Sequence, residues 1–133
     1  MKKLIRLFAV AIVMILASCS GNSPSAVAEK YMNYMNDGEY DKVVELIYTK
    51  PETPEDKVKE EMEDFVEFLK EMRKDIKEEE KIKSLKIISE EINEDGTKAV
   101  VKYSSVLNNG KEENSEIKLI KNEKGKWKID LGK

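Results

Sequence analysis

Hydrophobic residues along the chain follow a helical pattern before the charged run Lys77–Lys83 and an alternating pattern after it. The most regular helical stripe has apolar residues spaced alternately by four and three positions, at Val58, Met62, Phe65, Leu69, Met72 and Ile76. This spacing places them on one face of an amphipathic helix. We predict that this helix starts with Thr53 as its N-cap and Pro54 in its first position, followed by acidic residues at the positive end of the helix dipole.

Two shorter helices are expected before this one. Asn22 or Ser23 can cap a first helix with Pro24 in its first turn, and the Asn-Asp-Gly sequence at 36–38 ends it. The apolar positions on one side of this helix are Val27, Tyr31 and Tyr34 or Met35. A second helix is predicted from about Glu39 to Tyr48, before a Lys-Pro pair stops it. Its buried positions are expected to be Val43, Val44 and Ile47.

The remainder of the chain has the period of two that is typical of strands. Four strands are expected, at 85–92, at 99–105, around Ile117 and Leu119, and at Trp127, Ile129 and Leu131. Turn sequences rich in Asn and Gly separate them at 93–96, 108–110 and 122–125. Three short connections in a row predict an antiparallel meander with one charged, solvated face. The helices then cover the other face, which gives an α+β architecture.

The N-terminus has the three parts of a bacterial lipoprotein signal. A positive n-region contains Lys2, Lys3 and Arg6. The apolar run Leu7–Leu16 is too short to span a bilayer, and it leads into Leu16-Ala17-Ser18-Cys19, which ends in the only cysteine of the chain. We expect residues 1–18 to be a signal peptide, residues 19–23 an acylated tether, and residues 24–133 one domain. Acyl chains on Cys19 would then hold this domain on a membrane of the bacterial envelope.

Charge and composition argue against several kinds of function. The chain has 24 Lys and Arg against 27 Asp and Glu, and three of the basic residues lie in the predicted signal peptide. The mature domain is therefore acidic, which disfavours nucleic-acid binding and electrostatic attachment to anionic lipid. The chain has no histidine, and acylation would remove the thiol of Cys19. We therefore predict no metal site, no disulfide and no cofactor.

Both ends of the mature domain resemble the nuclear-transport-factor-2-like (NTF2-like) superfamily. The segment 26–46 looks like its opening helices, joined by an Asn-Asp-Gly turn and an aromatic-charged pair, and Lys124–Asp130 is similar to its last strand. The lipidation signal combined with this domain resembles the bacterial lipoprotein family called domain of unknown function 4878. The resemblance implies a cone of curved sheet and helices whose pocket serves catalysis, ligand binding or dimerisation. Catalytic members often place an Asp–His or Tyr–Asp set inside the cone.

The aromatic residues are the candidates for reaching such a pocket. They are Tyr31, Tyr34, Tyr48, Tyr103 and Trp127. The competing interpretation is that they fill the core, with their polar atoms at its rim. We expect a non-enzymatic module that binds a small apolar ligand or an envelope protein. Formation of a homodimer is a further possibility. The alternative is an envelope enzyme that pairs a tyrosine with a carboxylate, for instance Asp41 or Asp130.

Overall fold

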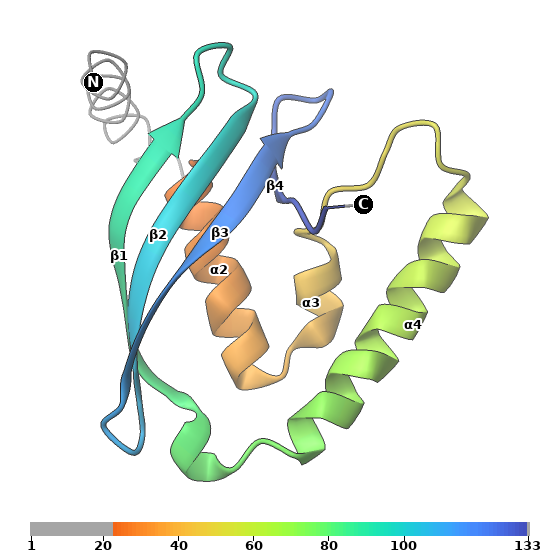
Figure 1. Ribbon diagram of the computed structural model, residues 1–133. Helices are drawn as coiled ribbons and strands as arrows, with labels where there is room; N and C mark the ends of the chain where they lie inside the picture. Colours follow the sequence, from red (N-terminus) through yellow and green to blue (C-terminus); the bar gives the residue numbers. More distant parts are fainter. Residues whose placement is uncertain (1–22, 133) are drawn as a thin grey trace.

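The computed structural model describes residues 23–132 and places the helices before the strands (Figure 1). The elements are the helices α2 (Pro24–Asp37), α3 (Tyr40–Val44) and α4 (Glu55–Lys74), the short 3-10 helix η2 (Glu78–Glu80), and the strands β1 (Ile82–Ile92), β2 (Lys98–Leu107), β3 (Glu112–Lys121) and β4 (Trp127–Ile129). The predicted α+β class is confirmed. The predicted signal peptide and Cys19 lie outside the described residues. No described helix has both the length and the hydropathy to cross a bilayer.

The four strands form one antiparallel sheet in the order β1-β2-β3-β4, which confirms the predicted meander. One face of the sheet is charged and solvated, with Lys102 opposite Glu116. The other face packs against α2, which lies behind the strands in Figure 1. The core between them contains Val101, Leu119, Trp127 and Ile129 from the sheet, Val27 and Ala28 from α2, and Tyr40 and Val43 from α3.

Helix α2 begins and ends where the sequence predicts. The Ser23 hydroxyl accepts a hydrogen bond from the backbone N–H of Ala26, and Pro24 occupies the first turn. Gly38 closes the helix in the left-handed conformation, with a φ of 78°. The side chain of Asn36 then makes two 2.9 Å hydrogen bonds with the backbone of Ile82, which join the end of α2 to the start of β1.

The second predicted helix is shorter than expected. Helix α3 ends at Val44 instead of near Tyr48, because the following backbone pairs with β4. Ile129 N–H donates to the carbonyl of Leu46 at 2.7 Å, and Tyr48 N–H donates to the carbonyl of Ile129 at 2.9 Å. This short parallel pairing covers the free edge of β4. Strand β4 itself ends at Ile129, so the prediction that Leu131 belongs to it is wrong.

Helix α4 differs most from its prediction. It starts one residue later, with Pro54 at the N-cap position and no side-chain cap, so the predicted cap by Thr53 is wrong. It packs beside α3, apart from the sheet (Figure 1). Of its predicted apolar stripe only Leu69 is buried, Met72 is 48% exposed, and Ile76 lies beyond the end of the helix.

Strand β1 contains a bulge that changes which residues face the core. Ile87 pairs with Tyr103 and Ser89 pairs with Lys102, so Ile88 has no partner in β2. A bulge inserts one extra residue and reverses the alternation beyond it. As a result Ile88 is 55% exposed, and the carboxylate of Glu90 lies on the core face with only 5% exposure.

Candidate ligand cleft

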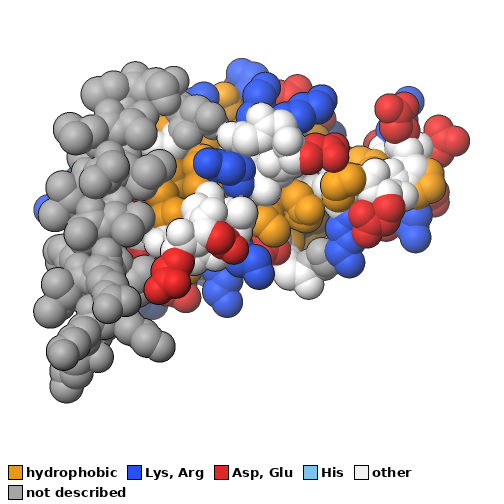
Figure 2. Space-filling view, turned by 90° about the horizontal axis from the view of Figure 1, so that it is seen from above, with side chains coloured by type: hydrophobic (Ala, Val, Ile, Leu, Met, Phe, Trp, Pro, Cys, Tyr) orange, Lys and Arg blue, Asp and Glu red, His pale blue; other side chains and the backbone are white. Residues whose placement is uncertain are grey.

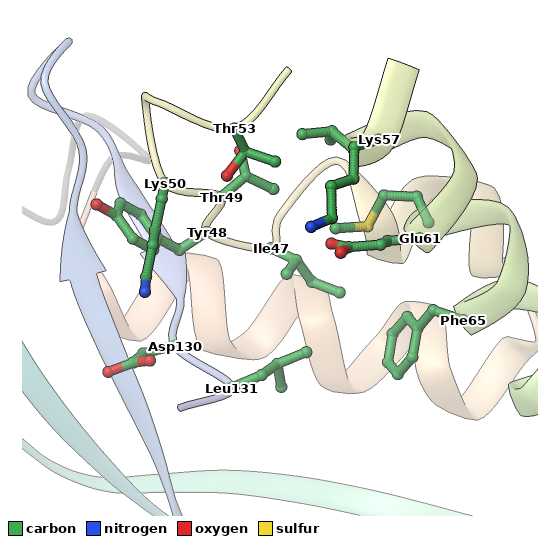
Figure 3. Close-up of a pocket in the computed structure, with 12 residues that line it drawn as sticks. Ile47, Tyr48, Thr49, Lys50, Thr53, Lys57, Glu61, Phe65, Asp130 and Leu131 are labelled. Carbon is green, nitrogen blue, oxygen red and sulfur yellow. The ribbon is translucent and has the colours of Figure 1, made fainter. Parts of the chain in front are cut away.

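A cleft opens between the segment that follows α3, the first half of α4 and the residues that follow β4 (Figure 3). Its volume is about 350 Å³. Its apolar wall consists of Ile47, Val58, Met62, Phe65 and Leu131. Its polar rim consists of Tyr48, Thr49, Lys50, Thr53, Lys57, Glu61 and Asp130.

Local sequence chemistry keeps this cleft open. The backbone hydrogen bond from Tyr48 to Ile129 fixes the point at which the segment after α3 turns away from β4. Pro51 and Pro54 then disfavour helix in the residues before them, which keeps the connection to α4 irregular. Within α4 the apolar side chains recur at helical spacing and face the cleft, while Lys57 and Glu61 lie one turn apart on its rim.

A second hollow adjoins the first along the 47–53 segment. Its volume is about 540 Å³. The residues that it shares with the first are Ile47, Tyr48, Thr49, Lys50, Thr53, Val58 and Met62. Its remaining wall comes mainly from the β3–β4 turn and the start of α4. The charged residues of that wall are Lys59, Lys124 and Lys128 together with Glu45, Glu55 and Glu123.

Lys128 is the most constrained cation of this wall. Its ammonium group donates a hydrogen bond of 2.8 Å to the backbone carbonyl of Glu45. Partial burial lowers the pKa of Lys128, and the nearby charges of Lys126 and Lys124 lower it further, while the Glu45 carboxylate opposes them. The lysines of the β3–β4 turn are therefore close enough to repel one another.

The polar groups of the cleft are hydroxyls, carboxylates and the ammonium groups of Lys50 and Lys57. The hydroxyl of Tyr48 and the carboxylate of Asp130 both lie at one side of the close-up, away from Glu61 (Figure 3). The Asp130 carboxylate accepts a 2.8 Å hydrogen bond from the N–H of Gly132. Within residues 23–132 no group of three His, Cys, Asp or Glu side chains is arranged to hold a metal ion. An apolar wall with a mixed polar rim is suited to binding a small apolar or amphipathic molecule.

The structure distributes the predicted pocket residues over several sites. Tyr48 lines the cleft. Trp127 is 3% exposed in the core. Tyr31, Tyr34 and Tyr103 are partly buried and pack against the core, away from the cleft. Burial raises the pKa of Tyr31, and the neighbouring Tyr103 raises it further.

Several other residues of the cleft were assigned different roles from the sequence. Leu131 was expected to belong to a strand, and it is 43% exposed at the cleft instead. Val58, Met62 and Phe65 were expected to face the core through the stripe of α4. Met62 and Phe65 do pack against the core, and all three also line the cleft. No sequence pattern identified an element that packs against this stripe. An apolar stripe without an identified partner is the signal that could have indicated a cleft. Asp41 is exposed on α3 and does not line the cleft, whereas Asp130 does.

The model of the family described as a domain of unknown function, DUF4878, matches residues 17–130. The chain belongs to this family. A crystal structure from Campylobacter jejuni, provisionally described as an NTF2-like transpeptidase, shares the fold of this DUF4878 protein with a TM-score of 0.65. The likeness covers 81% of this chain and 97% of that chain, at 18% sequence identity. It therefore shows the NTF2-like fold alone. No match is found among curated proteins.

Proposed function

We propose that this DUF4878 protein is a non-enzymatic binding module of the bacterial envelope that holds a small apolar ligand in the cleft beside α4. The observation that carries the proposal is the preformed apolar wall of Ile47, Val58, Met62, Phe65 and Leu131. The cleft volume of about 350 Å³ lies within the range of roughly 300 to 1,000 Å³ for ligand pockets.

The chemistry of the rim favours binding over catalysis. The chain lacks histidine, the side chain that most often serves as a general base near neutral pH. The rim offers hydroxyl, ammonium and carboxylate groups around an apolar wall, and such groups orient a ligand through a few hydrogen bonds. The ligand therefore gains most of its affinity from the apolar surface that it covers.

Leu131→Glu is expected to weaken binding of the neutral apolar dye Nile red by about tenfold or more, which corresponds to at least about 1.4 kcal/mol. The new carboxylate would have to lose its water against an apolar ligand, which is unfavourable. A fluorescence titration of the full-length acylated protein in detergent measures the affinity.

Met72→Glu is the matched control, because Met72 has a similar exposure on α4 and does not line the cleft. It adds the same charge and should leave the affinity for Nile red unchanged. Equal effects of the two substitutions would show that the dye does not bind in the cleft.

The anchor is the second part of the proposal. The Leu-Ala-Ser-Cys site and the apolar run before it support acylation of Cys19. Cys19→Ala is expected to abolish incorporation of a clickable fatty acid and to leave the precursor uncleaved or the protein released from the membrane. Ser20→Ala, beside the site, should keep full incorporation. Equal labelling of Cys19→Ala and the wild type would refute the anchor.

A small envelope enzyme is the second candidate, because Tyr48 and Asp130 line the same cleft and the related structure is described as a transpeptidase. In that case the acylated wild type should turn over a peptide substrate. Tyr48→Phe and Asp130→Asn should each abolish that turnover while Nile red binding persists. A wild type that binds the dye and turns over no peptide would instead support the binding module.

A further inference from the structure

The β3–β4 turn is a basic segment of an otherwise acidic domain. Lys121, Lys124, Lys126 and Lys128 lie within or beside it, and Glu123 is its one acidic residue. Lys124 and Lys126 are exposed, and the lowered pKa of Lys128 reflects in part its crowding by these two charges. Such a cluster of like charges favours contact with an anionic surface.

This basic turn lies at the end of the molecule where the described chain begins. Ser25 N–H, in the first turn of α2, donates a 2.8 Å hydrogen bond to Glu90 near the end of β1. Lys121 N–H, at the end of β3, donates a 2.7 Å bond to the carbonyl of Thr97 in the β1–β2 turn. The start of α2 and the two turns therefore share one end of the sheet, the upper end in Figure 1. Figure 2 views this end, where Lys and Arg side chains lie beside patches of apolar ones and Asp and Glu side chains lie among them.

The opposite end of the sheet has a different charge pattern. It carries the run Glu78–Glu80 on η2, which is joined to the β2–β3 turn by a 2.8 Å hydrogen bond from Asn108 to the carbonyl of Glu78. Glu112 and Glu113 begin β3 at this end and add further negative charge. Lys77, Lys81, Lys83 and Lys111 lie at this end too, and Lys81 forms a 2.7 Å ion pair with Glu78, so the charges of this end largely balance. An anionic membrane should therefore attract it less than the basic turn.

The length of the predicted tether decides which end lies at the membrane. Cys19 is four residues before Ser23, and four residues span at most about 14 Å when fully extended. Acyl chains on Cys19 would therefore hold the start of α2 close to the bilayer surface. The β1–β2 and β3–β4 turns are the parts of the described chain that lie at that end.

We propose that the β3–β4 turn, with Lys124 and Lys126 at its tip, contacts the anionic headgroups of the membrane to which the domain is anchored. The inference rests on the proposed anchor at Cys19. A lysine near an anionic bilayer strengthens binding by about fivefold, which cannot hold a free acidic domain on the surface. A short tether supplies a high effective concentration, so the same lysines suffice to orient the anchored domain.

The β1–β2 turn would reinforce this orientation of the domain. The β1–β2 turn carries Glu94 and Asp95, whose charges an anionic surface repels. Attraction of one turn and repulsion of the other would tilt the domain about its tether. The β3–β4 turn also forms a wall of the second hollow of the cleft, so this tilt would bring the cleft towards the headgroups.

Energy transfer from a thiol-linked dye to headgroup-labelled acceptor lipids tests the proposal. The dye is placed at Glu123→Cys in the basic turn or at Glu113→Cys at the opposite end, since acylation leaves no other free thiol. The full-length acylated protein is reconstituted in vesicles of phosphatidylcholine alone or of phosphatidylcholine with phosphatidylglycerol. Transfer from position 123 is expected to exceed that from position 113, to rise with phosphatidylglycerol and to fall with salt.

Charge reversal identifies the lysines responsible. Lys124→Glu combined with Lys126→Glu should reduce transfer from position 123 on the anionic vesicles to its value on phosphatidylcholine alone. Lys83→Glu combined with Lys111→Glu makes the same change in net charge at the opposite end, and it should leave this transfer higher than on phosphatidylcholine. Protein that floats with the vesicles but gives equal transfer from both labelled positions, or no response to the first pair, overturns the orientation alone. Protein that does not float with the vesicles overturns the anchor and the orientation together.

Discussion

Trp127→Ala is expected to lower the free energy of unfolding by about 3 to 5 kcal/mol, because it removes a buried aromatic side chain and leaves a cavity. The indole lies in the core between α2 and the sheet, where the surrounding residues cannot close the space fully. The ammonium group of Lys121 lies 5.1 Å from the ring centre and would lose a cation–π partner as well. Chemical denaturation of the mature domain measures the change.

Tyr103→Ala provides the comparison for this prediction. Tyr103 packs against the same core from β2, but it is only partly buried, so its loss should be clearly smaller than that at Trp127. A loss below about 1 kcal/mol at Trp127 would contradict its place in the core. Neither substitution should change Nile red binding at the cleft, since neither residue lines it.

The two ends of α2 and the turns between the strands could be predicted because their causes are local. The cap by Ser23, the proline in the first turn and the left-handed glycine after Asp37 each act within a few residues of the backbone that they fix. The Asn- and Gly-rich turns between the strands are of the same kind. For these elements the sequence alone was sufficient.

Elements that depend on distant partners could not be predicted in the same way. The residues after Val44 have the apolar spacing of a helix, yet the backbone from Leu46 to Tyr48 pairs with Ile129, more than eighty positions later in the sequence. Pairing of this kind satisfies two backbone groups of the β4 edge that would otherwise stay unpaired. No local pattern in the sequence shows that pairing with β4 is favoured over helix formation in these residues.

The burial of Glu90 was unpredictable for a related reason. A regular β1 would place Ile88, Glu90 and Ile92 on one face and Ile87 on the other. The bulge at Ile88 instead exposes Ile88 and leaves Glu90 and Ile92 on the core face. The Glu90 carboxylate accepts the N–H of Ser25 at the positive end of α2, which compensates part of its desolvation. This stabilising hydrogen bond comes from a helix whose donor residue lies sixty-five positions away in the sequence.

The candidate site shows the same limit. The period of α4 correctly predicted a helix with one apolar face, but it could not identify what that face contacts. In the structure the first half of the face lines a cleft instead of the sheet. Only Tyr48 of the five aromatic candidates lies there, because its neighbour Ile47 is fixed against β4 by the parallel bridge.

Gly38→Ala is expected to destabilise the domain more than Gly125→Ala, although both glycines have a φ of 78°. The left-handed conformation alone costs an alanine about 1 to 2 kcal/mol at either position. At Gly125 a new Cβ meets nothing within 4 Å, whereas at Gly38 it lies 3.0 Å from the guanidinium carbon of Arg73. That guanidinium donates hydrogen bonds to the carbonyls of Met35 and Asn36 at the end of α2.

The additional loss at Gly38 should come from these hydrogen bonds, since a flexible arginine can move away from the methyl group but then leaves the carbonyls of α2 without its donor. Displacing the guanidinium is expected to add about 1 to 2 kcal/mol to the loss. A double-mutant cycle measured by chemical denaturation separates the two contributions. In an Arg73→Ala background Gly38→Ala should cost only what Gly125→Ala costs. If Gly38→Ala costs the same with and without Arg73, the guanidinium is not what holds the end of α2 against α4.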